Sequence, residues 1–166
     1  MIELKADKMK IKVISESPKE TQKIASFFMQ AVLRQYIPKQ NGLVVSLEGP
    51  LGGGKTEFLK GIAKFLKLKE KVFSPTFLIM KSFPCPPAGR TGKTSFFKTL
   101  WHLDFYRIEK PKEIKELDFS GIIKNPQNLI FIEWGDKIKK VLPKSHLKIK
   151  FKITGENTRI LIFDIH

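Results

Sequence analysis

The chain has 166 residues and 19.1 kDa, the length of one domain, and its 42% hydrophobic and 28% charged residues are typical of a globular protein. No apolar run reaches the roughly 20 residues of a membrane span. The first ten residues lack a secretory signal, and the single cysteine, Cys85, excludes a cysteine zinc cluster. We therefore expect one cytoplasmic domain over residues 1–166 without membrane contact, and its net charge of +15 favours polyanionic partners.

The first elements along the chain are predicted to be a strand, a helix and a buried strand. The first strand covers Ile11–Ser15, and Ser17 can cap a helix that begins at Pro18. Apolar residues then recur at helical spacing until Pro38. Residues 43–47 form a nearly continuous apolar run, which is typical of a buried parallel strand.

A glycine-rich turn and a second helix follow, and three further strands are expected at 77–83, 99–105 and 128–133. A helix beginning near Pro111 lies between the last two of these strands. Residues 84–98 are expected to form a basic loop insertion. The tail alternates apolar residues with lysines over 147–153 and continues the pattern after a turn at Gly155, which predicts two antiparallel strands.

Residues 49–56, Gly-Pro-Leu-Gly-Gly-Gly-Lys-Thr, match the phosphate-binding pattern G-x-x-x-x-G-K-[ST] between a strand and a helix. Glycines allow successive N–H groups to converge on phosphate oxygens, and the helix adds its positive end. Lys55 can reach the β and γ phosphates, and the Thr56 hydroxyl can ligate Mg²⁺. The motif predicts ATP/ADP and Mg²⁺ binding by Gly49, Gly52, Gly53, Gly54, Lys55 and Thr56, on a three-layer α/β fold of the P-loop NTPase type with a mostly parallel central sheet and a C-terminal antiparallel hairpin.

A second Gly-Lys-Thr occurs at 92–94, but Pro87 stands where the pattern needs its first glycine, and no apolar strand precedes it. We interpret that segment as a basic surface loop.

Two acids end apolar strands and are candidates for the metal and catalytic positions. Asp104 ends the strand Leu-Trp-His-Leu, and Glu133 ends Leu-Ile-Phe-Ile. Both should emerge at the carboxyl edge of the sheet, where open α/β folds bind ligands. One could hold Mg²⁺ and the other orient the attacking water, and the pattern does not divide these roles. His102 is expected to be packed or hydrogen-bonded rather than catalytic, and Trp134 is either a core aromatic or a lid against the nucleotide.

Four motifs in order resemble the TsaE (YjeE) family, the bacterial P-loop ATPases needed for threonylcarbamoyladenosine formation on tRNA. They are the loop at 49–56, Ser-Pro-Thr-Phe at 74–77, His-Leu-Asp-Phe-Tyr-Arg at 102–107 and Glu-Trp at 133–134. The resemblance covers about residues 17 to 135. Two departures, Pro50 where the family commonly has an acid and Gly53 where it commonly has alanine, remove no phosphate ligand.

The resemblance implies a set of roles and partners. Thr56, Asp104 and Glu133 would lie at Mg²⁺, with Lys55, Asp104 and Glu133 acting in catalysis. Thr21, Thr76, Trp134 and Gly155 would lie near the nucleotide, Thr76 within a switch that senses the γ-phosphate. The implied partners are the TsaD and TsaB proteins, and tRNA directly or through their complex, with ATP hydrolysis supporting repeated rounds of modification.

Two other functions are compatible with parts of the sequence. A small P-loop metabolite kinase would need an arginine-rich lid, which we do not find. A basic RNA-binding module would fit the seven lysines of residues 137–152, but would not need intact Lys55, Thr56, Asp104 and Glu133. The lysines at 148, 150 and 152 have a second interpretation, which is protection of an exposed edge strand against aggregation.

Overall fold

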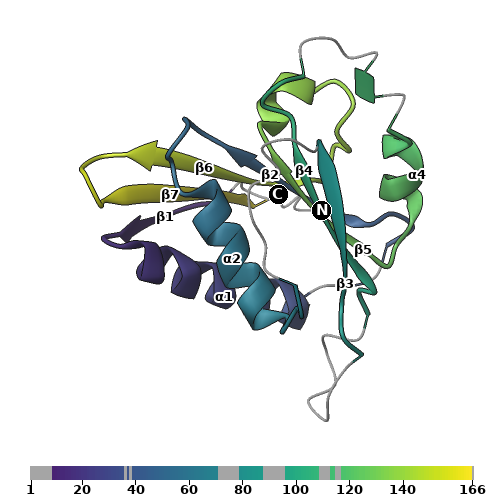
Figure 1. Cartoon of the computed structure of the whole chain (residues 1–166), viewed down its shortest axis with the longest axis horizontal. Coiled ribbons are helices and arrows are strands. Elements are labelled where there is room, and N and C mark those ends of the chain that lie inside the picture. Colours follow the sequence, from purple (N-terminus) through teal and green to yellow (C-terminus); the bar gives the residue numbers. More distant parts are fainter. Residues whose placement is uncertain are drawn as a thin grey trace, which may run out of the picture.

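The computed structural model describes residues 9–35, 37, 39–70, 79–87, 96–108, 113–114 and 117–165. Its centre is a seven-stranded sheet in the order β1-β7-β6-β2-β5-β4-β3 (Figure 1). The strands are β1 (Met9–Ser15), β2 (Leu43–Glu48), β3 (Met80–Pro84), β4 (Thr99–Asp104), β5 (Asn128–Glu133), β6 (Leu147–Ile153) and β7 (Arg159–Ile165). The helices named here are α1 (Pro18–Gln35), α2 (Lys55–Phe65), α4 (Phe119–Lys124) and the short 3-10 helix η1 (Gly135–Ile138).

The middle of the sheet is parallel and both flanks are antiparallel. β6, β2, β5 and β4 run in the same direction, with β2 between β6 and β5. β7 pairs antiparallel with β6, β1 with β7, and β3 with β4. The predicted α/β fold with a parallel centre and a C-terminal antiparallel hairpin is therefore confirmed.

Most predicted elements differ from the observed ones only at their ends. The predicted strand 128–133 coincides with β5, whereas the strand expected from Phe77 is observed from Met80, with its first two residues outside the described part. Pro84, expected to open the loop, is the last residue of β3. The expected helix start near Pro111 lies outside the described residues, and α4 begins at Phe119.

Helices cover the sheet unequally. α1 and α2 pack on one face, where their apolar residues meet β2, β5, β6 and β7 in one core cluster that includes Met29, Phe58, Phe131 and Phe163. The two helices are close enough that a Cβ at Gly61 would lie 2.4 Å from the Gln22 carbonyl. α4 and η1 pack on the opposite face, in a second cluster with β2, β4 and β5. Figure 1 shows the two groups of helices on opposite sides of the sheet.

In the half of the sheet made by β1, β7 and β6, the described helices cover one face. Its inward side chains, including Ile149, Phe151, Leu161 and Phe163, are buried under α1 and α2. Because β6 lies between β7 and β2, its lysines are not on an edge strand. The edge-protection interpretation of these lysines is therefore wrong, and β1 and β3 form the edges among the described strands.

The start of α1 shows the predicted cap. The Glu20 N–H donates to Ser17 Oγ at 3.2 Å, and the Glu20 carboxylate accepts from the Glu16 N–H at 2.6 Å. This reciprocal pair satisfies backbone donors at the helix start. Among the described residues, no helix has the length and apolarity needed to cross a membrane.

Candidate active site

The loop at 49–56 connects β2 to α2 at the carboxyl edge of the parallel strands. Gly49 and Gly54 have positive φ angles of 145° and 97°, in the region that other residues rarely adopt. A Cβ on Gly49 would lie 2.5 Å from the Phe151 carbonyl of β6, so the glycine also allows the two backbones to approach closely. The loop ends where α2 begins, which directs the free N–H groups of the helix into the loop.

Lys55 is folded back into this loop. Its side chain is 4% exposed, and Nζ donates to the carbonyls of Gly49 and Pro50 at 2.8 Å each. The same Nζ lies 4.3 Å from the centre of the Trp134 ring. Burial lowers the pKa of the Lys55 ammonium, and the nearby carboxylates of Glu133, Asp104 and Asp136 oppose that shift.

Glu133 is the centre of a short hydrogen-bonded chain. It is 4% exposed, and its Oε1 accepts from Thr56 Oγ1 at 3.3 Å and lies 3.0 Å from His102 Nε2. His102 is fully buried on β4, so it is the hydrogen-bonded histidine that the strand pattern predicts. The contact to His102 fixes the carboxylate beside the hydroxyl of the phosphate-loop threonine.

Asp104 lies beside Glu133 on the neighbouring strand, because the register of β4 and β5 pairs these two residues. Its carboxylate is half-buried and accepts from the Tyr106 N–H at 3.0 Å. Burial raises the pKa of Asp104, the Tyr106 hydrogen bond opposes the rise, and the charge of Glu133 adds to it. The structure thus brings together the two acids that the strand ends predict, and Glu133 is hydrogen-bonded to Thr56.

The donor set at this edge fits a magnesium ion. A threonine hydroxyl and two carboxylates offer the hard oxygen ligands that Mg²⁺ prefers. Among the described residues, no group of three or more His, Cys, Asp or Glu side chains is arranged to hold a metal. The protein would therefore supply only part of the coordination shell, as is usual where substrate phosphates and water supply the rest.

Trp134 closes the site from the side of η1. It has a left-handed backbone with φ of 60°, and its half-buried ring contacts the second core cluster and lies 5.2 Å from the Tyr106 ring. It packs partly into the core and partly over Lys55. The core interpretation of Trp134 therefore describes one side of the ring, whereas the lid against the nucleotide stays a prediction.

A small pocket of about 90 Å³ opens on the other side of the loop. It is lined by Ser17, Pro18, Thr21, Gly52, Gly54, Glu57, Asn157 and Arg159, from α1, the loop, α2 and the β6–β7 turn. Thr21 is buried here, and its hydroxyl is 2.7 Å from Ser15 Oγ. Thr21 is therefore next to the loop, and its position near the nucleotide stays a prediction.

Arg159 connects the C-terminal turn to the phosphate loop, and the sequence reasoning missed it. Its Nε donates to the Gly52 carbonyl at 3.1 Å, and its Nη1 donates to the Gly155 carbonyl at 3.0 Å. Arg159 thereby links Gly155 to the loop. The sequence feature that could have drawn attention to Arg159 is its position at the start of a strand, in a chain whose basic residues are mostly lysines.

Glu48 was also missed. It ends β2 directly before Gly49, it is buried, and its Oε1 makes no hydrogen bond to any residue that the structure describes. Thr76 and the rest of the expected switch at 74–77 lie outside the described residues, as does the second Gly-Lys-Thr at 92–94.

Comparison with known proteins gives one family. The family model described as "Threonylcarbamoyl adenosine biosynthesis protein TsaE" matches residues 15–161. The tRNA threonylcarbamoyladenosine biosynthesis protein TsaE of Rickettsia felis is 34% identical over 149 residues, covering 89% of this chain and 76% of its own. The Bacillus subtilis protein of the same name is 36% identical over 124 residues, covering 74% and 69%. The crystal structure of Bacillus subtilis YdiB superposes with a TM-score of 0.66 at 28% identity, over 95% of this chain and 86% of that one.

Proposed function

The chain belongs to the TsaE family, which takes part in tRNA threonylcarbamoyladenosine biosynthesis, and from this premise we propose that it is a Mg²⁺-dependent ATPase of that process. One observation carries the proposal most strongly. Lys55, Thr56, Asp104 and Glu133 converge beside the glycine loop, at the edge where parallel sheets bind ligands.

ATP would bind with its phosphates in the loop 49–56. Backbone N–H groups of Gly52, Gly53 and Gly54 and the start of α2 would hold the phosphate oxygens. Lys55 would exchange the carbonyls of Gly49 and Pro50 for the β and γ phosphates, because a phosphate offers a charge-assisted bond that a carbonyl does not. The pocket beside Thr21 and Arg159 would accept another part of the nucleotide.

Hydrolysis would use the two acids in different ways. Mg²⁺, held by Thr56 and one or both carboxylates, would neutralise charge on the phosphates. The arrangement favours Glu133 as the residue that orients water, because His102 fixes its carboxylate. Asp104, whose pKa is raised, is the other candidate, either as a ligand of Mg²⁺ or as the general base. The expected products are ADP and phosphate.

The proposed task is to reset the modifying complex formed by TsaD and TsaB in the cytoplasm. Loss of the γ-phosphate would release a switch, and the resemblance assigns that switch to Ser74–Phe77, including Thr76. The cycle would thereby change the affinity of the chain for its partners, and tRNA would take part through the complex.

A reconstitution tests this role. It contains tRNA, threonylcarbamoyl-adenylate, TsaB, TsaD and this chain, and the measured quantity is modified tRNA per partner complex. The wild type should give several products per complex, whereas Glu133→Gln should stall near one. Equal yields with wild type, variant or no added chain would refute the role, and phosphate transfer to nucleosides would then indicate the kinase alternative.

A further inference from the structure

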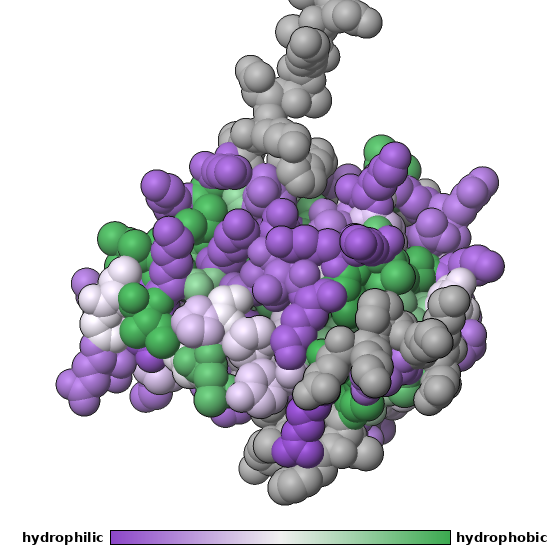
Figure 2. Space-filling model, turned by 90° about the horizontal axis from the view of Figure 1, so that it is seen from above, coloured by the Kyte–Doolittle hydropathy of each residue, from purple (hydrophilic) through white to green (hydrophobic). Residues whose placement is uncertain are grey.

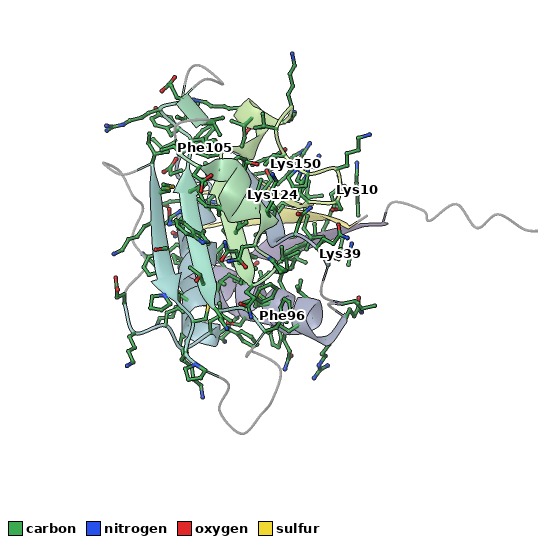
Figure 3. The ribbon with its side chains drawn as sticks, turned by 90° about the vertical axis from the view of Figure 1, so that its right-hand side faces the viewer. Lys10, Lys39, Phe96, Phe105, Lys124 and Lys150 are labelled. Carbon is green, nitrogen blue, oxygen red and sulfur yellow. The ribbon has the colours of Figure 1, made fainter. Side chains whose placement is uncertain are left out.

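In the part of the chain that the structure describes, one face of the β1-β7-β6 half of the sheet carries no helix, and its side chains form an ordered pattern. The register aligns three rows across these strands: Lys10 with Asp164 and Lys148, Lys12 with Ile162 and Lys150, and Ile14 with Ile160 and Lys152. These nine residues, here called the open face, alternate with the side chains buried under α1 and α2. Figure 3 shows Lys10 and Lys150 on the same side of the molecule.

The open face has an apolar strip with basic borders. Ile160 and Ile162 follow each other on the central strand β7, and Ile14 lies beside Ile160 and is 60% exposed. Lysines lie on both sides, from β1 and from β6. Figure 2 shows the surface as seen from above Figure 1, where hydrophilic side chains predominate and hydrophobic areas are separate. An exposed apolar patch with a polar border is typical of a docking surface for protein.

Among the described residues, no helix covers this face. Ile160 and Ile162 belong to neither core cluster, although both are partly buried by their neighbours. The adjoining β2-β5-β4 half has α4 and η1 on the same side of the sheet. The η1 helix meets β2 closely enough that a Cβ on Gly135 would lie 2.1 Å from Ser46 Oγ. The helical layer thus stops at β2 and leaves β6, β7 and β1 without a second layer.

We propose that the open face is a docking site for an acidic amphipathic helix of a partner protein. A helix would continue the layer formed by α4 and η1, with its apolar stripe on Ile14, Ile160 and Ile162. Acidic residues beside that stripe would meet Lys12, Lys150 and Lys152, each of which is exposed. Asp164 is 3.9 Å from Lys148, and Glu48 of β2, which is in register with Lys150, is buried.

Other occupants fit the open face less well. A second copy of the chain would bring two lysine-rich surfaces together, which like-charge repulsion disfavours. An RNA surface of this kind commonly offers aromatic rings for stacking or arginines for phosphates, and the nine residues include neither. The apolar strip would also remain in contact with phosphates and water instead of being buried.

The first arm of the test uses a helix-stapled, fluorescein-labelled peptide of about 20 residues, with leucine on one face and glutamate beside it. Its affinity is measured by fluorescence anisotropy for wild type and for the triple variant Lys12→Glu, Lys150→Glu, Lys152→Glu. The matched control, Lys19→Glu, Lys23→Glu, Lys64→Glu, makes the same charge change on exposed positions of α1 and α2. We expect at least ~10-fold weaker binding for the first variant and less than about twofold for the control.

Two further measurements test the apolar strip and the kind of partner. Ile14→Ser should weaken peptide binding about threefold, and a peptide with lysine in place of glutamate should not bind. Absence of binding by the acidic peptide, or equal losses in both triple variants, would overturn the inference. Binding of an unmodified tRNA transcript that only the open-face variant loses, without peptide binding, would assign the face to RNA instead.

The second arm repeats the comparison with the purified TsaB–TsaD complex, and only this choice of partner rests on the proposed function. Association that the open-face variant alone loses would identify the docking partner and support the inference. Peptide binding without any association of wild type with TsaB–TsaD would support the docking site and refute the proposed partner. Unchanged ATP affinity in both variants would show that the phosphate loop is intact.

Discussion

The two halves of the sheet differ in what their side chains face. In the β2-β5-β4 half, helices cover both faces, every residue of β5 is buried, and the loop, His102, Asp104 and Glu133 meet at one edge. In the β1-β7-β6 half, one face is packed under α1 and α2 and the other presents lysines and isoleucines. A fixed carboxylate pair needs the first environment, because a low dielectric strengthens every charge contact in it. Recognition of a partner surface needs exposed side chains such as those of the β1-β7-β6 half.

The largest difference between the halves should be in stability. Phe131 on β5 is fully buried, whereas Ile14 on β1 is 60% exposed. Phe131→Ala should lower the free energy of unfolding by about 3–5 kcal/mol, because it leaves a cavity in the core. Ile14→Ala should change it by less than about 0.5 kcal/mol. Urea unfolding of both variants measures this, and similar costs would mean that the open face is covered in the folded protein.

The second-largest difference between the halves should be in their effect on the rate of ATP hydrolysis. Glu133→Gln and Asp104→Asn each remove one charge from the proposed metal site, and we expect each to lower the rate of phosphate release by ~10²-fold or more. ATP should still bind detectably. The control is Asp164→Asn, which makes the same kind of change on the open face and should leave the rate within about twofold. A wild-type rate in both site variants would refute the assigned roles.

Nucleotide affinity should depend on one lysine of the site, Lys55, and on none of the lysines of the open face. Lys55→Ala should weaken binding of ATP–Mg²⁺ about tenfold or more, because it removes a charge-assisted contact to phosphate. Lys150→Ala and Lys93→Ala should leave the affinity unchanged in calorimetry. A large loss on substitution of Lys93 would move the phosphate site to the second Gly-Lys-Thr.

The raised pKa of Asp104 gives a pH-dependent prediction for the free protein. The folded state holds this proton to higher pH than the unfolded state, so stability from this group is complete below the ordinary aspartate pKa and is lost as pH rises through the raised value. Asp104→Asn should therefore raise Tm at neutral pH, and the gain should disappear in acid. A gain of equal size at both pH values would mean that burial of the charge is not the cause.

The smallest effect is expected from the lysines of β6. Replacing Lys148, Lys150 and Lys152 by glutamine should change stability by no more than about 0.5 kcal/mol, because Lys150 and Lys152 are exposed and the Lys148–Asp164 pair is long. Association with an acidic partner should weaken and depend less on salt. An unchanged salt dependence would remove these lysines from the docking site.

Local patterns were sufficient to predict most of the elements and to select the residues that the fold brings together at the candidate site. The loop 49–56 and the acids at two strand ends follow from motifs and hydrophobic runs, and parallel pairing then places Asp104 beside Glu133. The pairing of β1 with β7 did not follow, because a strand's partner depends on contacts far apart in the chain. For the same reason Arg159 was missed, since its bond to Gly52 spans more than a hundred residues. The interior position of β6 likewise became visible only in the strand order.

The contact between Lys55 and Trp134 offers an optical signal for the proposed cycle. An ammonium 4.3 Å from an indole ring alters its emission, and phosphates that attract Lys55 would change that contact. The chain has only two tryptophans, and Trp101 lies on β4, on the opposite face of the sheet from His102. A Trp101→Phe protein would therefore have a single tryptophan, Trp134, beside the phosphate loop. Stopped-flow mixing with ATP could then follow binding, hydrolysis and release without any attached dye.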